Sequence, residues 1–189
     1  MRSRDDHGVD IYRLCLDGML LGAALLLSYL EAILPPLLWI PLPGFKLGLC
    51  NVLITVAFLA VSPRDAAAIS LCRILLMGWL FGNGMSLIFS LCGGICAYVG
   101  LWLFAVAGKR WFGLIGVSVG CAALHQLGQL GAACVLLRTN AVYSYLPALL
   151  LSALIFGTVT GILLQLFLPR FEQIKRKWMK RDGATYVER

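Results

Sequence analysis

Six long runs of apolar residues, separated by short breaks that contain polar residues, proline or glycine, organise the chain. Each run is continuous rather than alternating, so it predicts a helix and not a strand. A helix needs about 20 apolar residues to cross a bilayer. The pattern therefore predicts an all-α integral membrane protein with six transmembrane helices. The predicted spans cover residues 12–34, about 44–61, 66–81, 85–107, 112–137 and 146–168.

The breaks carry residues that end or begin helices. Pro35-Pro36 lacks two backbone N–H groups, so the first helix is expected to stop before it. Ser62-Pro63 is typical of a helix N-terminus, and Gly82-Asn83-Gly84 predicts a tight turn. We divide the chain into a cytoplasmic N-terminus (1–11), a single six-helix membrane domain (12–168) and a basic cytoplasmic tail (169–189).

The composition agrees with a membrane location. Hydrophobic residues make up 60% of the chain and charged residues 13%, whereas an average soluble domain is about 45–50% apolar and about 25% charged. A chain of this size has too little polar material to cover a surface that faces water. The composition therefore excludes a soluble globular enzyme, a disordered chain and a fibrous repeat.

The basic residues are concentrated on one side of the predicted helices. Thirteen lysines and arginines fall in the N-terminus with the first residues of the first span, the second and fourth connections and the tail, against two in the other connections, Lys46 and Arg138. By the positive-inside rule this predicts a multi-pass protein of the cell membrane with both termini in the cytoplasm. Because this placement beside membrane lipids accounts for the net charge of +7, we expect no nucleic-acid partner.

The tail leaves two interpretations open. Phe171, Ile174 and Trp178 recur at helical spacing among basic residues. This pattern is typical of a helix that lies on an anionic leaflet. A frayed, charged chain end is the alternative.

Polar side chains within the predicted spans gather in the outer halves of these spans. Such groups are costly in a bilayer and tend to be functional or paired. With the orientation above and a rise of about 1.5 Å per residue, their positions predict a polar cavity that opens outward. The candidate substrate-binding residues are Glu31, Lys46, Asn51, Arg73, Asn83, His125, Gln126 and Gln129.

This set suits a small solute with an anionic or amide-like group. A buried arginine with amide neighbours favours a carboxylate or phosphate, and His125 and Gln129 share one helix face. Structural roles remain as alternatives. Arg73 can form an ion pair with Glu31 or snorkel to the interface. His125 can form a helix–helix hydrogen bond, and Lys46 can anchor the chain at the interface.

No catalytic or metal-binding arrangement is recognisable in the sequence. The paired aspartates Asp5-Asp6 lie outside the spans, and there is no serine-nucleophile turn, HExxH motif or phosphate-binding loop. The seven cysteines form no CxxC motif and are interpreted as small packing residues. We therefore expect a chain that is not an enzyme by itself and that holds neither a metal nor a cofactor.

Small residues on the first span indicate a close helix contact. Gly18 and Gly22 form a GxxxG motif, which lets another helix approach closely. The neighbouring helix can belong to the same chain or to a partner protein.

Four segments resemble one family of membrane proteins. The stretch Pro43-Gly44-Phe45-Lys46-Leu47-Gly48-Leu49-Cys50-Asn51 resembles the PG-x-KLGL-x-N signature of the Gx transporter family, which is also catalogued as heptaprenyl diphosphate synthase component I. Residues 73–76, 89–94 and 125–130 resemble its further motifs, with Gln126 where that family usually has asparagine. Tyr145-Leu146-Pro147 and the Gly157/Gly161 pair also fit, so the resemblance covers residues 18–168.

The resemblance implies a fold and a function. The family is similar to the substrate-binding (S) components of energy-coupling factor transporters, which have six helices and rely on a transmembrane coupling protein and two ATPases. By this resemblance, Gly18 and Gly22 would contact the coupling protein. The first hypothesis is thus a substrate-binding and translocation subunit for a small solute. The second is a non-catalytic membrane accessory subunit of isoprenoid or quinone biosynthesis, as the synthase label suggests.

Overall fold

The described part of the chain is entirely helical apart from short connections. The computed structural model describes residues 4–37, 48–81, 84–107 and 113–181. These residues contain no strand, which confirms the predicted all-α class. They form α1 (Arg4–Leu37), α2 (Leu49–Ala60), α3 (Pro63–Leu80), α4 (Gly84–Ala107), α5 (Leu114–Leu137), a short 3-10 helix η1 (Asn140–Tyr145) and α6 (Leu146–Arg181).

Four of the described helical segments are long and apolar enough to cross a membrane. They are Arg13–Glu31 within α1, the whole of α4, the whole of α5, and Ala141–Ile174 through η1 and α6. The apolar α2 has 12 residues, which corresponds to about 18 Å of helix. The 18-residue α3 contains Arg64, Asp65 and Arg73. The chain is therefore a helical membrane protein in which the predicted second and third helices are the shortest.

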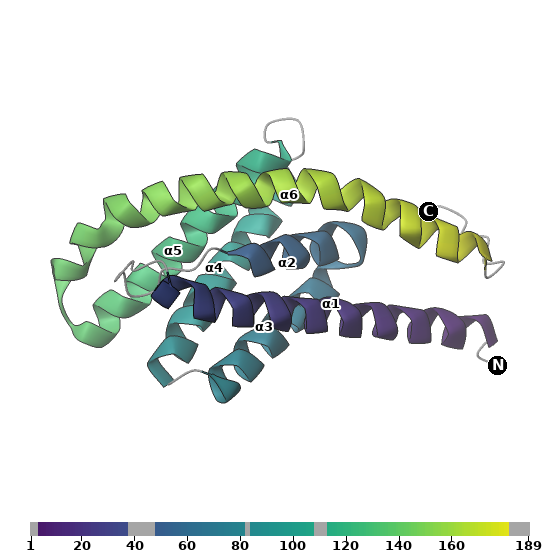
Figure 1. The fold of residues 1–189 in the computed structure, drawn as a ribbon, viewed down its shortest axis with the longest axis horizontal. Helices are drawn as coiled ribbons and strands as arrows, with labels where there is room; N and C mark the ends of the chain where they lie inside the picture. Colours follow the sequence, from purple (N-terminus) through teal and green to yellow (C-terminus); the bar gives the residue numbers. More distant parts are fainter. Residues whose placement is uncertain (1–3, 38–47, 82–83, 108–112, 182–189) are drawn as a thin grey trace.

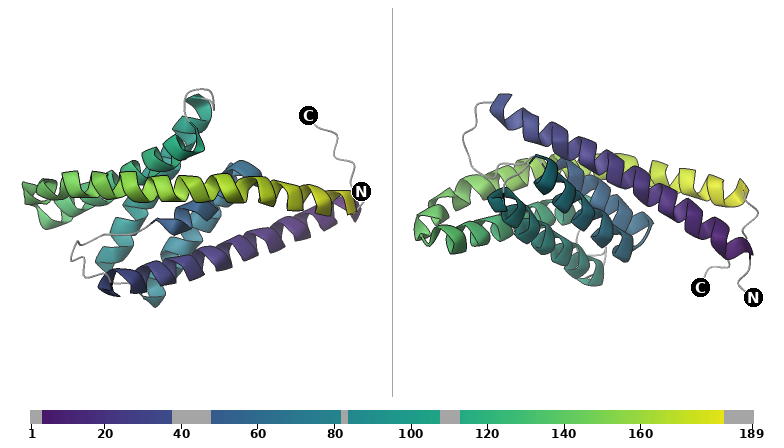
Figure 2. Two further views of the ribbon diagram at one scale, coloured as in Figure 1. Left: turned by 45° about the horizontal axis from the view of Figure 1, so that its top comes forward. Right: turned by 90° about the horizontal axis from the view of Figure 1, so that it is seen from below.

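Five helices form a closed ring, and the sixth lies against it. Around the ring, α2 contacts α3, α3 contacts α4, α4 contacts α5, α5 contacts α6, and α6 returns to α2. Helix α1 packs on α2 and α3. The long helices α1 and α6 run in opposite directions, and the start of α1 lies at the same end of the molecule as the end of α6 (Figures 1 and 2).

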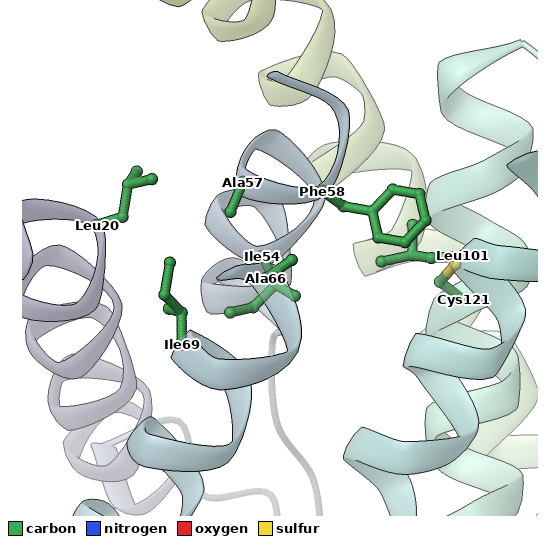
Figure 3. Close-up of a cluster of buried hydrophobic side chains, with 8 residues drawn as sticks. All are labelled: Leu20, Ile54, Ala57, Phe58, Ala66, Ile69, Leu101 and Cys121. Atoms are coloured by element: carbon green, nitrogen blue, oxygen red, sulfur yellow. The ribbon is translucent and has the colours of Figure 1, made fainter. Parts of the chain in front are cut away.

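The larger cluster of buried apolar side chains, called the apolar core below, lies around α2. Its buried side chains come from five different helices and surround α2 (Figure 3). Eight of the 12 residues of α2 are buried, so this helix is covered on most sides. Phe58 packs edge-on against Tyr98 and Trp102 of α4. The core residues are Leu20, Ile54, Ala57, Phe58, Ala66, Ile69, Leu101 and Cys121.

The outward-facing side chains are mostly apolar. Trp79, Val106 and Val135 are each about four-fifths exposed, and many leucines and isoleucines are exposed with them. A soluble monomer rarely shows apolar surface on this scale. Facing lipid chains, the same side chains need no further cover, as expected for a membrane protein.

Two helices continue past the residues where they were predicted to end. Helix α1 includes Pro35-Pro36 and ends at Leu37, so the predicted stop before these prolines is wrong. Proline fixes φ close to the helical value, and so close to the helix end only a few backbone bonds are lost. Helix α6 likewise continues through Pro169 to Arg181. The Ser62 cap is confirmed, because its hydroxyl accepts a hydrogen bond from the Arg64 N–H at 3.2 Å.

Glycines set the close contacts along α5. A Cβ atom at Gly157 or Gly161 of α6 would lie 2.7 Å from the Cα atom of Val119 or Ile115 on α5. On the α4 side, a Cβ at Gly128 would lie 2.7 Å from the backbone oxygen of Cys92. These three contacts involve backbone that cannot move aside. Only glycine therefore allows the observed distances between α4, α5 and α6.

An ion pair joins α1 to the start of α3. The Arg13 Nε lies 2.7 Å from the Asp65 Oδ2, and Asp65 is in the first turn of α3. We expect Asp65→Asn to lower the free energy of unfolding by about 1 kcal/mol, because both the ion pair and an interaction with the helix dipole are weakened. Thermal unfolding of the purified protein measures this effect. In the Arg13→Gln background, the same substitution should cost clearly less.

Candidate functional site

Buried polar side chains form a layer next to the apolar core. On α1, α3 and α5, Glu31, Arg73 and His125 lie one or more turns from the core residues Leu20, Ile69 and Cys121, away from the end where α1 starts. The exposed fractions are 4% for Glu31, 8% for Arg73, 9% for His125, 5% for Gln126 and 6% for Gln129. These are five of the eight predicted site residues, and the fold buries all five.

The first part of the layer is built by α1, α2 and α3 around Arg73. The Arg73 Nη1 donates to the Ser28 Oγ at 3.0 Å and contacts the Cys50 Sγ at 2.8 Å. The Cys50 N–H in turn donates to the Glu31 Oε1 at 3.3 Å, and the Cys50 Sγ lies 3.8 Å from the Glu31 Oε2. Cys50 therefore stands between the guanidinium and the carboxylate.

The local sequence explains why these groups meet. Ser28 and Glu31 are three residues apart on α1 and so share one helix face. Cys50 lies in the first turn of α2, where backbone N–H groups have no partner within the helix. The Glu31 carboxylate accepts a hydrogen bond from one of these groups, the Cys50 N–H. Negative charge at a helix N-terminus is also favoured by the helix dipole.

The second part of the layer lies on α5. The Nε2 atoms of Gln129 and His125 are 3.0 Å apart, one helical turn from each other. When the neutral ring carries its proton on Nδ1, the glutamine amide donates to the ring nitrogen. Gln126 lies on another face of α5, two turns along from Val119 and so on the side that packs on α6.

The adjacent glycines Gly93 and Gly94 of α4 place the two parts at the same level of the bundle. A Cβ at Gly93 would lie 2.8 Å from Gln129 Cγ and 2.9 Å from His125 Cε1. One at Gly94 would lie 2.6 Å from Cδ1 of Ile74, the residue after Arg73. The segment that matched a family motif in the sequence thus lets α3 and α5 approach α4 from two sides.

Several polar atoms of the layer lack a hydrogen-bond partner among the described residues. They are the Arg73 Nε and the Oε1 atoms of Gln126 and Gln129. In a membrane interior, each buried polar group without a hydrogen-bond partner costs roughly several kcal/mol of free energy. The layer therefore has both donor and acceptor positions available for a bound polar molecule or for water.

The remaining predicted site residues have different positions. Asn51 is half-buried in the first turn of α2, and its backbone oxygen accepts from the Thr55 hydroxyl at 2.8 Å. Lys46 and Asn83 lie outside the described residues. The predicted partner contacts Gly18 and Gly22 are exposed, and a Cβ at either would meet nothing within 4 Å.

Sequence reasoning missed Ser28 and Cys50. The sequence predicts that the cysteines are packing residues, but Cys50 contacts both charged groups of the first part. A usable signal was the position of Cys50 inside the family-like stretch, beside Asn51. Among the described residues, no group of three or more His, Cys, Asp or Glu side chains is arranged to hold a metal ion.

Comparison with known proteins identifies a family. No curated protein and no solved structure matches the chain. The family model described as heptaprenyl diphosphate synthase component I matches residues 20–167, which is most of the chain and includes all of the buried polar layer. The chain therefore belongs to the heptaprenyl diphosphate synthase component I family.

Proposed function

We propose that the protein is the membrane subunit that binds and translocates a small polar solute, with ATP hydrolysis supplied by partner proteins. The observation that carries this proposal is the buried polar layer with its unsatisfied atoms on Arg73, Gln126 and Gln129. Burying an arginine and two glutamines inside a membrane bundle is costly. A bound solute that fills the open hydrogen-bond positions offsets this cost.

The layered arrangement supports one direction of access. Along α1, α3 and α5, the core residues Leu20, Ile69 and Cys121 lie nearer to the end of the molecule where α1 starts than the polar residues Glu31, Arg73 and His125 do. With both termini in the cytoplasm, as the distribution of basic residues predicts, the polar layer faces outward. A solute would then enter from outside and meet the layer before it meets the core.

The exposed face of α1 offers a contact for a membrane partner. Gly18 and Gly22 have open space around them, and the neighbouring Met19 is 74% exposed. A helix of a transmembrane coupling protein can approach closely there. ATPases bound to that partner would supply the energy for translocation.

The family name favours a second function. As a component of a heptaprenyl diphosphate synthase, the chain would be a non-catalytic membrane partner of a soluble prenyl synthase. Gentle purification from the native membrane separates the two functions. Co-purifying ATPases support the solute-binding subunit, and a co-purifying prenyl synthase supports the accessory subunit.

Removing the Arg73 and His125 side chains from the layer tests the solute-binding function. We expect Arg73→Ala/His125→Ala to lower the affinity for the solute by about 100-fold, because at least one charge-assisted hydrogen bond, worth about 1.5–3 kcal/mol, is lost. The solute is first identified by mass spectrometry as the molecule retained by the wild-type protein. Its binding and its uptake into proteoliposomes are then measured.

The control is Arg64→Ala/Gln165→Ala, which removes two exposed polar side chains. This variant should bind and transport as the wild type does. Undiminished binding and uptake by Arg73→Ala/His125→Ala would contradict the assignment of the site.

A further inference from the structure

Arg73 is a buried cation that has no carboxylate within ion-pair distance among the described residues. Its Nη1 contacts a hydroxyl and a thiol, those of Ser28 and Cys50, and its Nε contacts no acceptor among the described residues. Within the described part of the chain it forms no ion pair. A buried guanidinium with an unused N–H is unfavourable, and an anion that accepts a hydrogen bond from the Nε would offset this cost, so the guanidinium is a docking point for an anion.

The same cluster limits how much negative charge it can accept. The Glu31 carboxylate accepts the Cys50 N–H and lies 3.8 Å from the Cys50 Sγ, the same sulfur that Arg73 contacts. A second negative charge on a ligand at Arg73 would therefore stand close to Glu31. Like charges repel strongly where water is scarce. The arrangement favours one negative charge over two or three.

We propose that the solute carries a single negatively charged group, such as a carboxylate or a phosphodiester, and that this group docks on the free Nε side of Arg73 against the Cys50 thiol. This inference rests on the proposed function and names the substrate class of that site. It also excludes a diphosphate group from this position. The unsatisfied amide oxygens of Gln126 and Gln129, at the same level of the bundle, would receive N–H or O–H donors from the rest of the solute.

Cys50 makes this proposal testable before the solute is known. Its thiol reacts with methanethiosulfonates: the thiolate attacks the sulfenyl sulfur, the bond to the sulfonyl sulfur breaks, methanesulfinate leaves and a mixed disulfide forms. Two reagents of similar size differ in charge. One carries a sulfonate (2-sulfonatoethyl methanethiosulfonate) and the other a quaternary ammonium (2-trimethylammonioethyl methanethiosulfonate). The ratio of their rates at Cys50 reports the charge that an approaching solute meets.

The experiment uses the full chain in lipid nanodiscs, and mass spectrometry of the Cys50 peptide gives each rate. Rates are divided by those with a free thiol in solution. We expect the anionic reagent to react about tenfold faster than the cationic one at Cys50. In Arg73→Gln the ratio should fall to about one, and in Arg73→Lys, which keeps the charge, it should stay well above one. The partly buried Cys134 of α5 serves as an internal reference whose ratio should not change.

The outcomes are distinct. Equal rates at Cys50, a faster cationic reagent, no reaction with either reagent, or a ratio that survives Arg73→Gln would each overturn the proposal. If Arg73→Gln does not fold, Arg73→Lys and the wild type still decide whether the ratio exceeds one.

A second measurement tests the limit to one charge. Dimethyl phosphate and inorganic diphosphate share their phosphorus chemistry but differ in charge. We expect dimethyl phosphate to slow the labelling of Cys50 at a several-fold lower concentration, and the reverse order would contradict the single-charge proposal. If the protein binds no solute but Cys50 still reacts faster with the anionic reagent, only the proposed function is refuted. A protein that takes up a solute without the preference refutes this inference alone.

Discussion

The Gly157→Leu variant is expected to fold poorly, because its side chain would have to occupy space that the α5 backbone fills. A Cβ at this position would lie 2.7 Å from the Val119 Cα and 3.2 Å from the Val119 nitrogen. Backbone atoms cannot rotate away, so α5 and α6 must move apart. Overpacking of this kind costs about 1–3 kcal/mol, and occasionally more. Thermal unfolding in detergent and the monodisperse fraction on size exclusion measure the loss.

The matched control is Gly131→Leu, in the exposed part of α5. A Cβ at Gly131 meets nothing within 4 Å, and the position faces outward. Both substitutions raise helix propensity by about the same amount, so their difference isolates the contact between helices. We expect Gly131→Leu to keep or raise the unfolding temperature. Equal loss in both variants would show that the α5–α6 distance is not set by Gly157.

The positions of the helices could be predicted because each follows from local sequence. Long apolar runs specify helices in a membrane, and Ser62-Pro63 specifies the start of α3 through a hydrogen bond within three residues. The continuation of α1 through Pro35-Pro36 and of α6 through Pro169 could not be predicted. A proline prevents one backbone bond, and the rest of the helix decides whether that loss ends it.

The GxxxG motifs show where the sequence is insufficient. Gly18/Gly22 of α1 and Gly157/Gly161 of α6 have the same spacing, yet only the α6 pair contacts another helix within the described residues. The motif indicates a face that another helix can approach, but not which helix approaches it. That choice depends on how the ring closes, and the contact of α6 with α2 that closes it joins segments far apart in the chain.

Five of the eight candidate site residues are buried in the fold, but the contacts that connect them could not be predicted. Burial of Arg73, His125, Gln126 and Gln129 followed from their places in apolar runs. The role of Cys50 did not, because a cysteine in an apolar run has the same sequence pattern whether it packs or accepts a hydrogen bond. Its partners lie on α1 and α3, and only the packing of three helices brings them together.

Replacing Arg73 with methionine is expected to stabilise the empty protein and to abolish its response to the solute. Methionine fills a similar volume without a charge, and keeping a guanidinium buried with no carboxylate in ion-pair contact among the described residues is costly. The two side chains that Arg73 contacts, Ser28 and Cys50, are neutral. The nearby Glu31 carboxylate keeps its hydrogen bond from the Cys50 N–H. Thermal unfolding of the solute-free protein measures the first effect.

The second effect appears when the solute is added. A ligand that binds only the folded state raises stability with its concentration, so the wild-type protein should gain unfolding temperature and Arg73→Met should not. Arg64→Met, at an exposed position, should leave both quantities as in the wild type. The opposite signs of the two effects separate the possible roles of Arg73. If Arg73 has a structural role, its replacement makes the empty protein less stable and leaves the response to the solute intact. If Arg73 binds the solute, its replacement makes the empty protein more stable and removes the response to the solute.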